Sequence, residues 1–295
     1  MATTPVTNGE LTMRTPTEQE LSVLARSYRR DGFAYVRNLF NPGELEPLAK
    51  ALDDGASPGA FAVADSAGGR QELSVWMHLG NDLIGVIPRL GPMVAVATAA
   101  IGEPVYHWHS KLSWKRPNTT SRWDWHQDFG FWADDGVDRP DMCTVAIAVG
   151  PVNRANGCMQ LIRGSHLGGR LDVVAVGQAR GTDPTAVDGL LTDNDVELCE
   201  LAPGDAVVFH GNTLHSSGPN QTDTPRTMLM SSYNALSNPP SAPRAEAYRP
   251  HPLDELPAGA IADGWHQVFG SSTFLDPMSD GIDQGYSIDS AGGSA

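Results

Sequence analysis

The chain has 295 residues, and we expect a single catalytic domain, because all-β barrels and sandwiches often use such a length for one core. Its formal net charge of −15 repels nucleic-acid backbones and anionic lipid surfaces, so neither nucleic acid nor a membrane is an expected partner. No apolar run reaches the roughly 18 residues of a membrane span, and the first residues lack the pattern of a secretory signal. We therefore expect a cytoplasmic protein.

A first helix is predicted over 17–30, where apolar residues recur at helical spacing. Thr17 and Glu20 have the spacing of a capping box, in which a hydroxyl and a carboxylate satisfy free amide groups at the helix N-terminus. Gly32 is expected to end this helix.

Four further segments are predicted in the N-terminal third. Alternation predicts a strand over 33–40, and an Asn-Pro pair begins a second helix over 41–52. A loop is expected around 57–69. The largely apolar segment 81–101 predicts a helix behind a sheet, although its two prolines must break or kink it.

From residue 106 onward, short β-branched and aromatic runs are separated by glycine, proline, asparagine and aspartate. This pattern is typical of an antiparallel barrel or sandwich. Strands are predicted near 105–115, 122–128, 142–149, 157–162, 196–201, 205–210, 214–217 and 226–234. The segment 163–195 is rich in glycine without sustained periodicity and is expected to be a long loop.

The same patterns give the domain organisation. We expect a flexible N-terminus over 1–14, one domain over 15–280, and a flexible C-terminal tail over 281–295, where glycine, serine and aspartate are frequent. The expected fold class is an all-β core with flanking helices (α+β), with the N-terminal helices packed on one sheet.

Two candidate metal ligands, His126 and Asp128, lie two residues apart in a predicted strand. Side chains at this spacing point to the same face of a strand, so both can reach one ion. His215 is the best candidate for a third ligand, and His210, five residues earlier, is its rival. Two imidazoles and one carboxylate leave positions open on an octahedral ion, as a non-haem iron(II) oxygenase requires.

Arg226 lies eleven residues after His215, at the head of an apolar run. A buried arginine is costly unless an anion pairs with it. The distal carboxylate of 2-oxoglutarate would be such an anion, held through a bidentate contact. The alternative is a surface arginine at the start of a strand.

Three motifs resemble those of the phytanoyl-CoA dioxygenase family, which includes ectoine hydroxylase and several bacterial amino-acid hydroxylases and halogenases. The resemblance runs from about Arg30 to Tyr233. The motifs are Trp125-His126-Gln127-Asp128, Asn156-Gly157-Cys158-Met159-Gln160 leading into Gly164-Ser165-His166, and His215-Ser216-Ser217-Gly218-Pro219-Asn220 followed by Arg226.

The resemblance implies a double-stranded β-helix, a jelly roll of the cupin type, with iron(II) at one open end. It implies that the iron ligands are His126, Asp128 and His215, and thus favours His215 over His210. It also implies that Arg226 binds the distal carboxylate of 2-oxoglutarate with help from the hydroxyl of Ser217.

Further contacts are implied by the resemblance to ectoine hydroxylase. Lys115 looks like the family's upstream lysine contact to 2-oxoglutarate, and Lys111 is the alternative. Trp132 matches a substrate-contacting aromatic residue, and His109 falls near another substrate position. Both of these residues can equally be packing residues.

The implied activity is hydroxylation of an unactivated C–H bond in a small metabolite, an amino acid or an intermediate of specialised metabolism. Iron(II) is the implied cofactor, with 2-oxoglutarate and dioxygen as cosubstrates and succinate and carbon dioxide as co-products. Asp128 favours oxygenation, because family halogenases have a small residue there that admits chloride. The alternatives are desaturation, cyclisation or epoxidation at the same site, or a jelly-roll binding protein without turnover.

The substrate and the assembly are only coarsely indicated. Few basic residues lie near the expected mouth of the site, which favours a free polar metabolite over an acyl-CoA. We expect a monomer or a homodimer.

Overall fold

The computed structural model describes residues 13–177, 179–241, 250–251, 253–262 and 267–276, together with the backbone of 288–290. The helices are α1 (Glu18–Asp31), α2 (Pro42–Asp53), α3 (Leu83–Val86), α4 (Gly91–Ile101), α5 (Asp128–Trp132) and α6 (Pro184–Asp193), and the 3-10 turns are η1 (Ile87–Arg89), η2 (Ser165–Gly168) and η4 (Ala258–Ile261). The strands are β1 (Phe33–Val36), β2 (Phe61–Ala64), β3 (Arg70–His78), β4 (Val105–Lys115), β5 (Trp123–His126), β6 (Met142–Ala148), β7 (Met159–Ile162), β8 (Val173–Val176), β9 (Ala179–Thr182), β10 (Val196–Cys199), β11 (Ala206–His210), β12 (His215–Ser217), β13 (Arg226–Ala235), β14 (Thr273–Phe274) and β15 (Ile288–Ser290).

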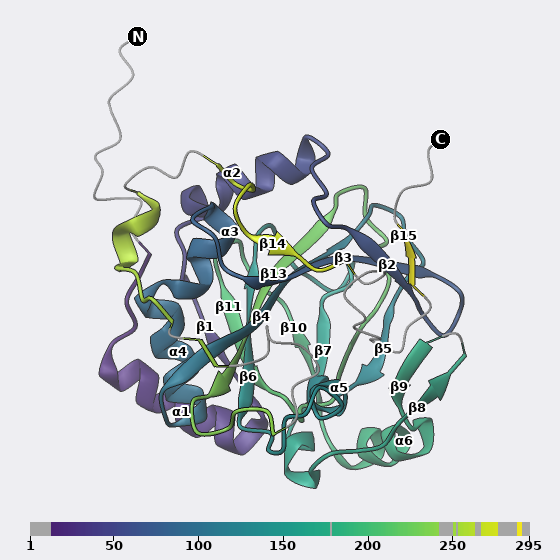
Figure 1. Ribbon diagram of the computed structural model, residues 1–295. Coiled ribbons are helices and arrows are strands. Elements are labelled where there is room, and N and C mark those ends of the chain that lie inside the picture. The colour runs from purple at the N-terminus through teal and green to yellow at the C-terminus, as the bar shows by residue number, and fades with distance from the viewer. Residues whose placement is uncertain are drawn as a thin grey trace.

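Two antiparallel sheets form the core of the described structure (Figure 1). The larger sheet has the strand order β1-β11-β6-β13-β4-β3-β2-β15, and β14 also pairs with β3. The smaller sheet has the order β10-β7-β12-β5. Side chains from both, among them Phe209 of β11 and Leu161 of β7, pack in one buried cluster. The predicted jelly roll with an all-β core is confirmed.

Helices α1 and α4 lie next to each other and cover the outer face of the larger sheet (Figure 1). Tyr28 of α1 and Val96 of α4 belong to the same buried cluster as Val145 of β6 and Val208 of β11. Successive side chains of a strand point to opposite faces of the sheet. Alternate residues of β6 and β11 therefore pack against these helices, and the others point into the interior of the jelly roll. The expected packing of N-terminal helices on one sheet is confirmed.

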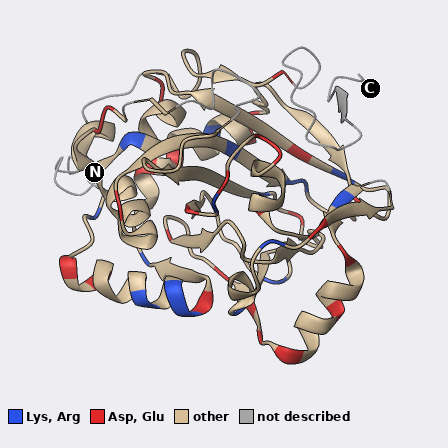
Figure 2. Cartoon of the chain, turned by 60° about the horizontal axis from the view of Figure 1, so that its bottom comes forward, with Lys and Arg blue, Asp and Glu red and all other residues tan. Residues whose placement is uncertain are grey.

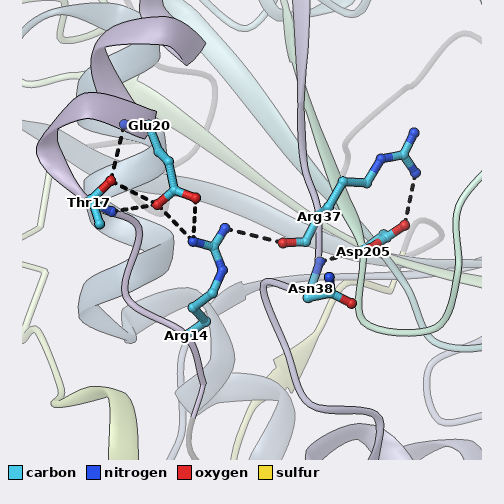
Figure 3. A network of polar contacts seen from close by, with 6 residues as sticks. All are labelled: Arg14, Thr17, Glu20, Arg37, Asn38 and Asp205. Carbon is cyan, nitrogen blue, oxygen red and sulfur yellow. Dashed lines mark hydrogen bonds and ion pairs between the residues drawn. The ribbon is translucent and has the colours of Figure 1, made fainter.

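The predicted first helix has the predicted caps. Thr17 accepts a hydrogen bond from the amide of Glu20, and the Glu20 carboxylate accepts one from the amide of Thr17. Gly32 ends the helix with a φ of 85°, a conformation that glycine adopts without strain. Arg14 links this cap to the turn after β1, since its guanidinium contacts Glu20 at 2.7 Å and the carbonyl of Arg37 at 3.2 Å (Figure 3).

The strand that follows is shorter than the expected 33–40, because β1 ends at Val36. Asn38 has a φ of 51°, which takes the chain out of the sheet. The buried carboxylate of Asp205 accepts hydrogen bonds from Arg37 Nη1 and from the amide of Asn38, both at 2.8 Å (Figure 3). This contact between distant parts of the chain fixes the turn, and the local alternation of residues did not reveal it.

The prediction of a loop around 57–69 is wrong in part. The segment contains β2. The next strand, β3, was not predicted either, and it pairs with β2 in antiparallel fashion so that Phe61 lies opposite Leu73. Apolar residues of both strands are buried in one cluster with Trp108 and Phe129. A short apolar run becomes a strand here because tertiary packing covers one face, which intrinsic propensity does not encode.

The predicted interruption of 81–101 is confirmed. The segment divides into α3, η1 and α4, and Pro88 and Pro92 lie in the first turns of η1 and α4. Proline is tolerated in a first turn because its missing amide hydrogen would have no partner within the helix. The predicted second helix is also present, as α2.

The prediction of a long loop over 163–195 is wrong. This segment contains η2, the hairpin of β8 and β9, and α6. Asp183 caps α6 by accepting a hydrogen bond from the amide of Thr185, and Val187 packs against Ile162 and Leu214. The high glycine content concealed these elements, and neither strand of the short hairpin shows a regular alternation of buried and exposed residues.

The remaining predicted strands are confirmed to within two residues at each end, as β4, β6, β7, β10, β11, β12 and β13. Of the terminal segments 1–14 and 281–295, only Met13, Arg14 and the backbone of β15 lie among the described residues. Figure 2 shows that α6 carries acidic residues alone, whereas α1 carries both signs of charge. Among the described helices, none combines the length and the apolar character of a membrane span.

Candidate active site

His126, Asp128 and His215 converge from three different elements. His126 is the last residue of β5, Asp128 is the first of α5, and His215 is the first of β12. Asp128 Oδ1 lies 3.9 Å from His126 Nε2 and 4.0 Å from His215 Nε2. One ligand atom from each residue lies within 4.8 Å of the others, which is close enough for a single metal ion.

The prediction that His126 and Asp128 point to the same face of one strand is wrong in detail, because β5 ends at His126. The chain turns at Gln127 into α5. Gln127 fixes this turn, since its Nε2 donates to the carbonyl of Asn212 at 2.8 Å and its Oε1 accepts from the amide of Leu171 at 2.8 Å. Gln127 is therefore a positioning residue that the sequence alone did not indicate.

Both imidazoles are held in the form that binds a metal. His126 Nδ1 lies 2.8 Å from the carbonyl of Asp124, and His215 Nδ1 lies 2.9 Å from the carbonyl of Thr213. Because a carbonyl only accepts, Nδ1 carries the proton in each ring and Nε2 keeps its lone pair. Burial lowers the pKa of His126 to about 3 and also lowers the pKa of His215, so both rings are neutral.

Asp128 is held ionised and oriented. Burial alone would raise the pKa of its carboxyl group, but the Lys111 ammonium, 3.5 Å from Oδ1, holds that pKa below its usual range. Oδ2 accepts a hydrogen bond from the Thr144 hydroxyl at 3.3 Å, and the Ser232 hydroxyl lies 2.8 Å from that of Thr144. Thr144 and Ser232 are opposite each other on β6 and β13, a pairing that the sequence does not display.

His210, the rival third ligand, lies outside this group. Its Nδ1 accepts a hydrogen bond from the amide of Asn212 at 2.9 Å. Its ring packs against those of Tyr28 and His166, with centroid distances of 5.6 and 5.3 Å. The described residues with metal-binding geometry thus include His215 and not His210.

A cavity with about 420 Å³ of empty space, including its opening, adjoins His126 and His215. Arg226 lines it with only 1% of the residue exposed. Arg226 Nη2 donates to the carbonyl of Gly157 at 3.0 Å, whereas Arg226 Nε, Arg226 Nη1 and Ser217 Oγ have no hydrogen-bond partner. Burial lowers the pKa of Arg226 to about 10, which leaves the guanidinium charged at neutral pH. A carboxylate would satisfy these buried donors.

The two candidate lysines on β4 occupy different places. Lys115 lies opposite Arg226 and donates hydrogen bonds to Gln71 Oε1 at 3.2 Å and to the carbonyl of Ser121 at 3.1 Å. Burial, and then the charge of Arg226, lower the pKa of Lys115 to about 6. Lys111 lines the cavity beside the histidines as well as a second one. Which lysine contacts a cosubstrate stays a prediction.

The second cavity has about 610 Å³ of empty space, including its opening, and adjoins His126 and Asp128. His109 and Trp132, the expected substrate contacts, both line it, and their ring centroids are 5.8 Å apart. His109 Nε2 is buried without a hydrogen-bond partner. Much of the remaining wall comes from β2 and β3. Because these two strands were not predicted, their lining residues were not expected at the site either.

The sequence relatives are oxygenases of small molecules. The family model for phytanoyl-CoA dioxygenase (PhyH) matches residues 28–228. The chain is 31% identical to L-proline trans-4-hydroxylase of Streptomyces griseoviridis over 182 residues, which cover 56% of this chain and 68% of that protein. It is 26% identical to ectoine dioxygenase of Bordetella parapertussis, with 74% of this chain and 77% of that protein covered.

Solved structures share the fold. EctD from S. alaskensis with bound Fe has a TM-score of 0.66 and 21% identity, with 83% of this chain and 92% of that chain covered. The epimerase SnoN in complex with Fe3+, alpha ketoglutarate and nogalamycin RO has a TM-score of 0.65 and 25% identity, with 81% and 91% covered. The predicted enzyme class, an iron- and 2-oxoglutarate-dependent dioxygenase, is confirmed. The chain belongs to the phytanoyl-CoA dioxygenase family.

Proposed function

We propose that this chain hydroxylates an unactivated C–H bond of a small metabolite, with iron(II) held by His126, Asp128 and His215. The observation that carries the proposal is the position of this triad beside a cavity in which Arg226 and Ser217 present buried donors without acceptors. A buried hydrogen-bond donor without an acceptor costs free energy. A site that contains several such donors is therefore suited to an anionic ligand.

The donor set fits iron(II). Two neutral imidazoles and one ionised carboxylate offset part of the charge of the ion, and no thiolate is present that would favour zinc or an iron–sulfur cluster at this triad. Three ligands leave open positions on an octahedral ion for a 2-oxo acid and dioxygen. Asp128 occupies one position that a halide would need, which favours oxygenation.

The adjoining cavity fits 2-oxoglutarate. Arg226 and His215 line the same cavity. A single dicarboxylate can therefore contact the guanidinium of Arg226 and also approach the metal site. Its distal carboxylate would accept hydrogen bonds from the guanidinium of Arg226, whose Nε and Nη1 have no partner, and from the Ser217 hydroxyl. Lys115 lies opposite Arg226 on the neighbouring strand, whereas Lys111 is the lysine that lines this cavity.

Bound iron and 2-oxoglutarate would supply oxidative decarboxylation coupled to substrate oxidation, with succinate and carbon dioxide as co-products. The residues of the chain hold and orient the reacting groups. Arg226 and Ser217 fix the cosubstrate, and Thr144 holds one oxygen of Asp128 away from the histidines. His109 and Trp132 line the space for the substrate. The walls of this space are largely apolar, which strengthens each polar contact beside them.

The relatives support hydroxylation of a small metabolite, since their names are L-proline trans-4-hydroxylase and ectoine dioxygenase. Other outcomes occur on this fold, because SnoN is described as an epimerase and SnoK as a carbocyclase. The placement of the substrate therefore decides between hydroxylation and other oxidations, and the mass of the product distinguishes them.

The test is anaerobic titration of the protein with iron(II) and 2-oxoglutarate, which should give a weak visible charge-transfer band. His126→Ala and His215→Ala should abolish the band. His210→Asn is the matched control, because it changes a buried histidine outside the triad while its amide oxygen can still accept from Asn212. A band that persists in both triad variants would overturn the assignment, and iron binding without succinate release for any candidate substrate would favour a binding protein.

A further inference from the structure

One wall of the substrate cavity is apolar and belongs to the β2–β3 hairpin. Phe61 and Val63 on β2, with Leu73, Val75 and Met77 on β3, line it. Phe61 lies opposite Leu73, so the two strands present a continuous surface. Burial of apolar ligand surface against such a wall is favourable, so this cavity favours a ligand with a sizeable apolar part.

Aromatic rings line the cavity near the metal site. Trp123 and Phe131 pack against His126, with ring centroid distances of 5.9 and 6.2 Å. Trp132 joins them from the end of α5. Flat apolar rings suit a hydrocarbon chain or ring system, and they offer little hydrogen bonding to a polyhydroxylated molecule.

The polar groups of this cavity are few. Lys111 brings an ammonium group whose contact to Asp128 Oδ1 is long, at 3.5 Å, and whose side chain is 18% exposed. His109 is 9% exposed, and its Nε2 has no hydrogen-bond partner. Burial lowers the pKa of His109 to about 3, so it offers a neutral ring nitrogen rather than a second charge.

The charges on the cavity wall disfavour a zwitterionic ligand. Among the described residues that line this cavity, Asp128 brings the one carboxylate, and the proposed function assigns that carboxylate to iron. A substrate ammonium group would then be buried without an anion, which is strongly unfavourable. The Lys111 ammonium has three N–H donors and one long contact to Asp128, so it can also donate to a ligand anion.

We propose that the substrate is a lipophilic carboxylic acid, bound as a monoanion with its carboxylate at Lys111 and its apolar part against the β2–β3 hairpin. This inference rests on the proposed function and refines it, because a free amino acid or another polar zwitterion is disfavoured. Lys111 also lines the cosubstrate cavity, but Arg226 and Ser217 already supply unpaired donors there.

The test uses protein loaded with zinc in place of iron and saturated with 2-oxoglutarate, with tryptophan fluorescence as the binding signal. The probes are a phenyl, a naphthyl and an n-alkyl compound, each as the carboxylic acid and as the primary amide. A second comparison sets L-phenylalanine, a zwitterion, against 3-phenylpropanoic acid, which lacks the ammonium group. We expect at least one acid to bind about tenfold tighter than its amide, as a charged hydrogen bond predicts. We also expect 3-phenylpropanoic acid to bind tighter than L-phenylalanine.

Variants locate the effect. Lys111→Met should reduce the acid-to-amide ratio to about one, and Lys111→Arg should restore it. Arg116→Met is the matched control, because it removes a largely exposed cation that directly follows the same strand, and it should leave the ratio unchanged. The proposal is overturned by equal binding of acid and amide, by no binding of any probe, or by tighter binding of L-phenylalanine. The iron charge-transfer band tests the proposed function separately, so a band that forms while the acid preference is absent rejects the substrate class alone.

Discussion

Arg226 on β13 and Lys115 on β4 lie directly opposite each other, and both are 1% exposed. Two like charges in this arrangement destabilise a sheet unless an anion joins them. The protein lowers the cost by keeping Lys115 mostly neutral, because burial and then the neighbouring guanidinium lower its pKa to about 6. A dicarboxylate bound at Arg226 would reverse this effect and favour the charged lysine.

Binding of 2-oxoglutarate is therefore expected to take up a proton near neutral pH. The pKa of free Lys115 is about 6, and a bound carboxylate raises it, so affinity should weaken as the pH rises from 6 to 8, by at most about tenfold per pH unit. Calorimetry in buffers of different ionisation enthalpy measures the uptake directly. Lys115→Met should remove the pH dependence, and a flat profile in the unaltered protein would show that Lys115 does not face the ligand.

Removal of the buried guanidinium should separate ligand binding from folding. Arg226→Met is expected to weaken 2-oxoglutarate binding by roughly 100-fold, the typical cost of losing a buried charged partner. The free energy of unfolding without ligand should not fall, because an apolar side chain of similar size replaces a charge whose Nε and Nη1 are unpaired. Chemical unfolding and a binding titration measure the two quantities. If Arg116→Met weakens 2-oxoglutarate binding as much as Arg226→Met does, the loss comes from the change in net charge and not from a specific contact with Arg226.

The hydroxyl of Thr144 is expected to support the metal site by orienting Asp128. Thr144→Val keeps the shape of the side chain but removes the hydrogen bond to Oδ2, and metal affinity should fall about 10-fold, the lower end for partners of metal ligands. Competition with a chelator measures this affinity, and Thr144→Ser should restore it. Ser231→Ala is the control, since its hydroxyl contacts Ser110 instead. Equal loss in both variants would mean a general effect of buried hydroxyls.

The turn at Asp205 should make stability depend on pH. Burial raises the pKa of this carboxyl group, but hydrogen bonds from the Asn38 amide and from Arg37 lower it more, so the net shift is downward. Its stabilising contribution is therefore present above the unfolded pKa of about 3.9 and is lost as the pH falls through the lower folded value. Asp205→Asn should cost about 1.5 to 3 kcal/mol at pH 7.5.

Urea unfolding at pH 7.5 and at successively lower pH checks this expectation. The difference between Asp205→Asn and the unaltered protein should narrow below about pH 4. Asp53→Asn, at an exposed position on α2, should change stability little at any pH. A constant difference across the whole range would assign the effect of Asp205 to packing rather than to its charge.

The metal triad was predictable because its spacing along the chain limits where the ligands can lie. Residues two apart, such as His126 and Asp128, stay within reach of one ion whether the backbone continues as a strand or turns into a helix. The prediction that both residues belong to one strand was wrong, since Gln127 binds Asn212 and the chain turns into α5. The two side chains nevertheless lie close enough to bind one ion. The position of Arg226 at the head of an apolar strand likewise suggested that it is buried, and its contact with an anion stays a prediction.

The tertiary structure decided the remaining features, because each depends on residues far apart in the sequence. Thr144 reaches Asp128 only because β6 pairs with β13. Lys111 and Lys115 lie on the same strand, and their different surroundings follow from what packs around each one. β2 was predicted to lie in a loop and β3 was not predicted, because burial of one face, rather than local propensity, makes those residues strands. The sequence by itself thus determined the chemistry of the metal site, whereas the choice of substrate depends on surfaces that only folding brings together.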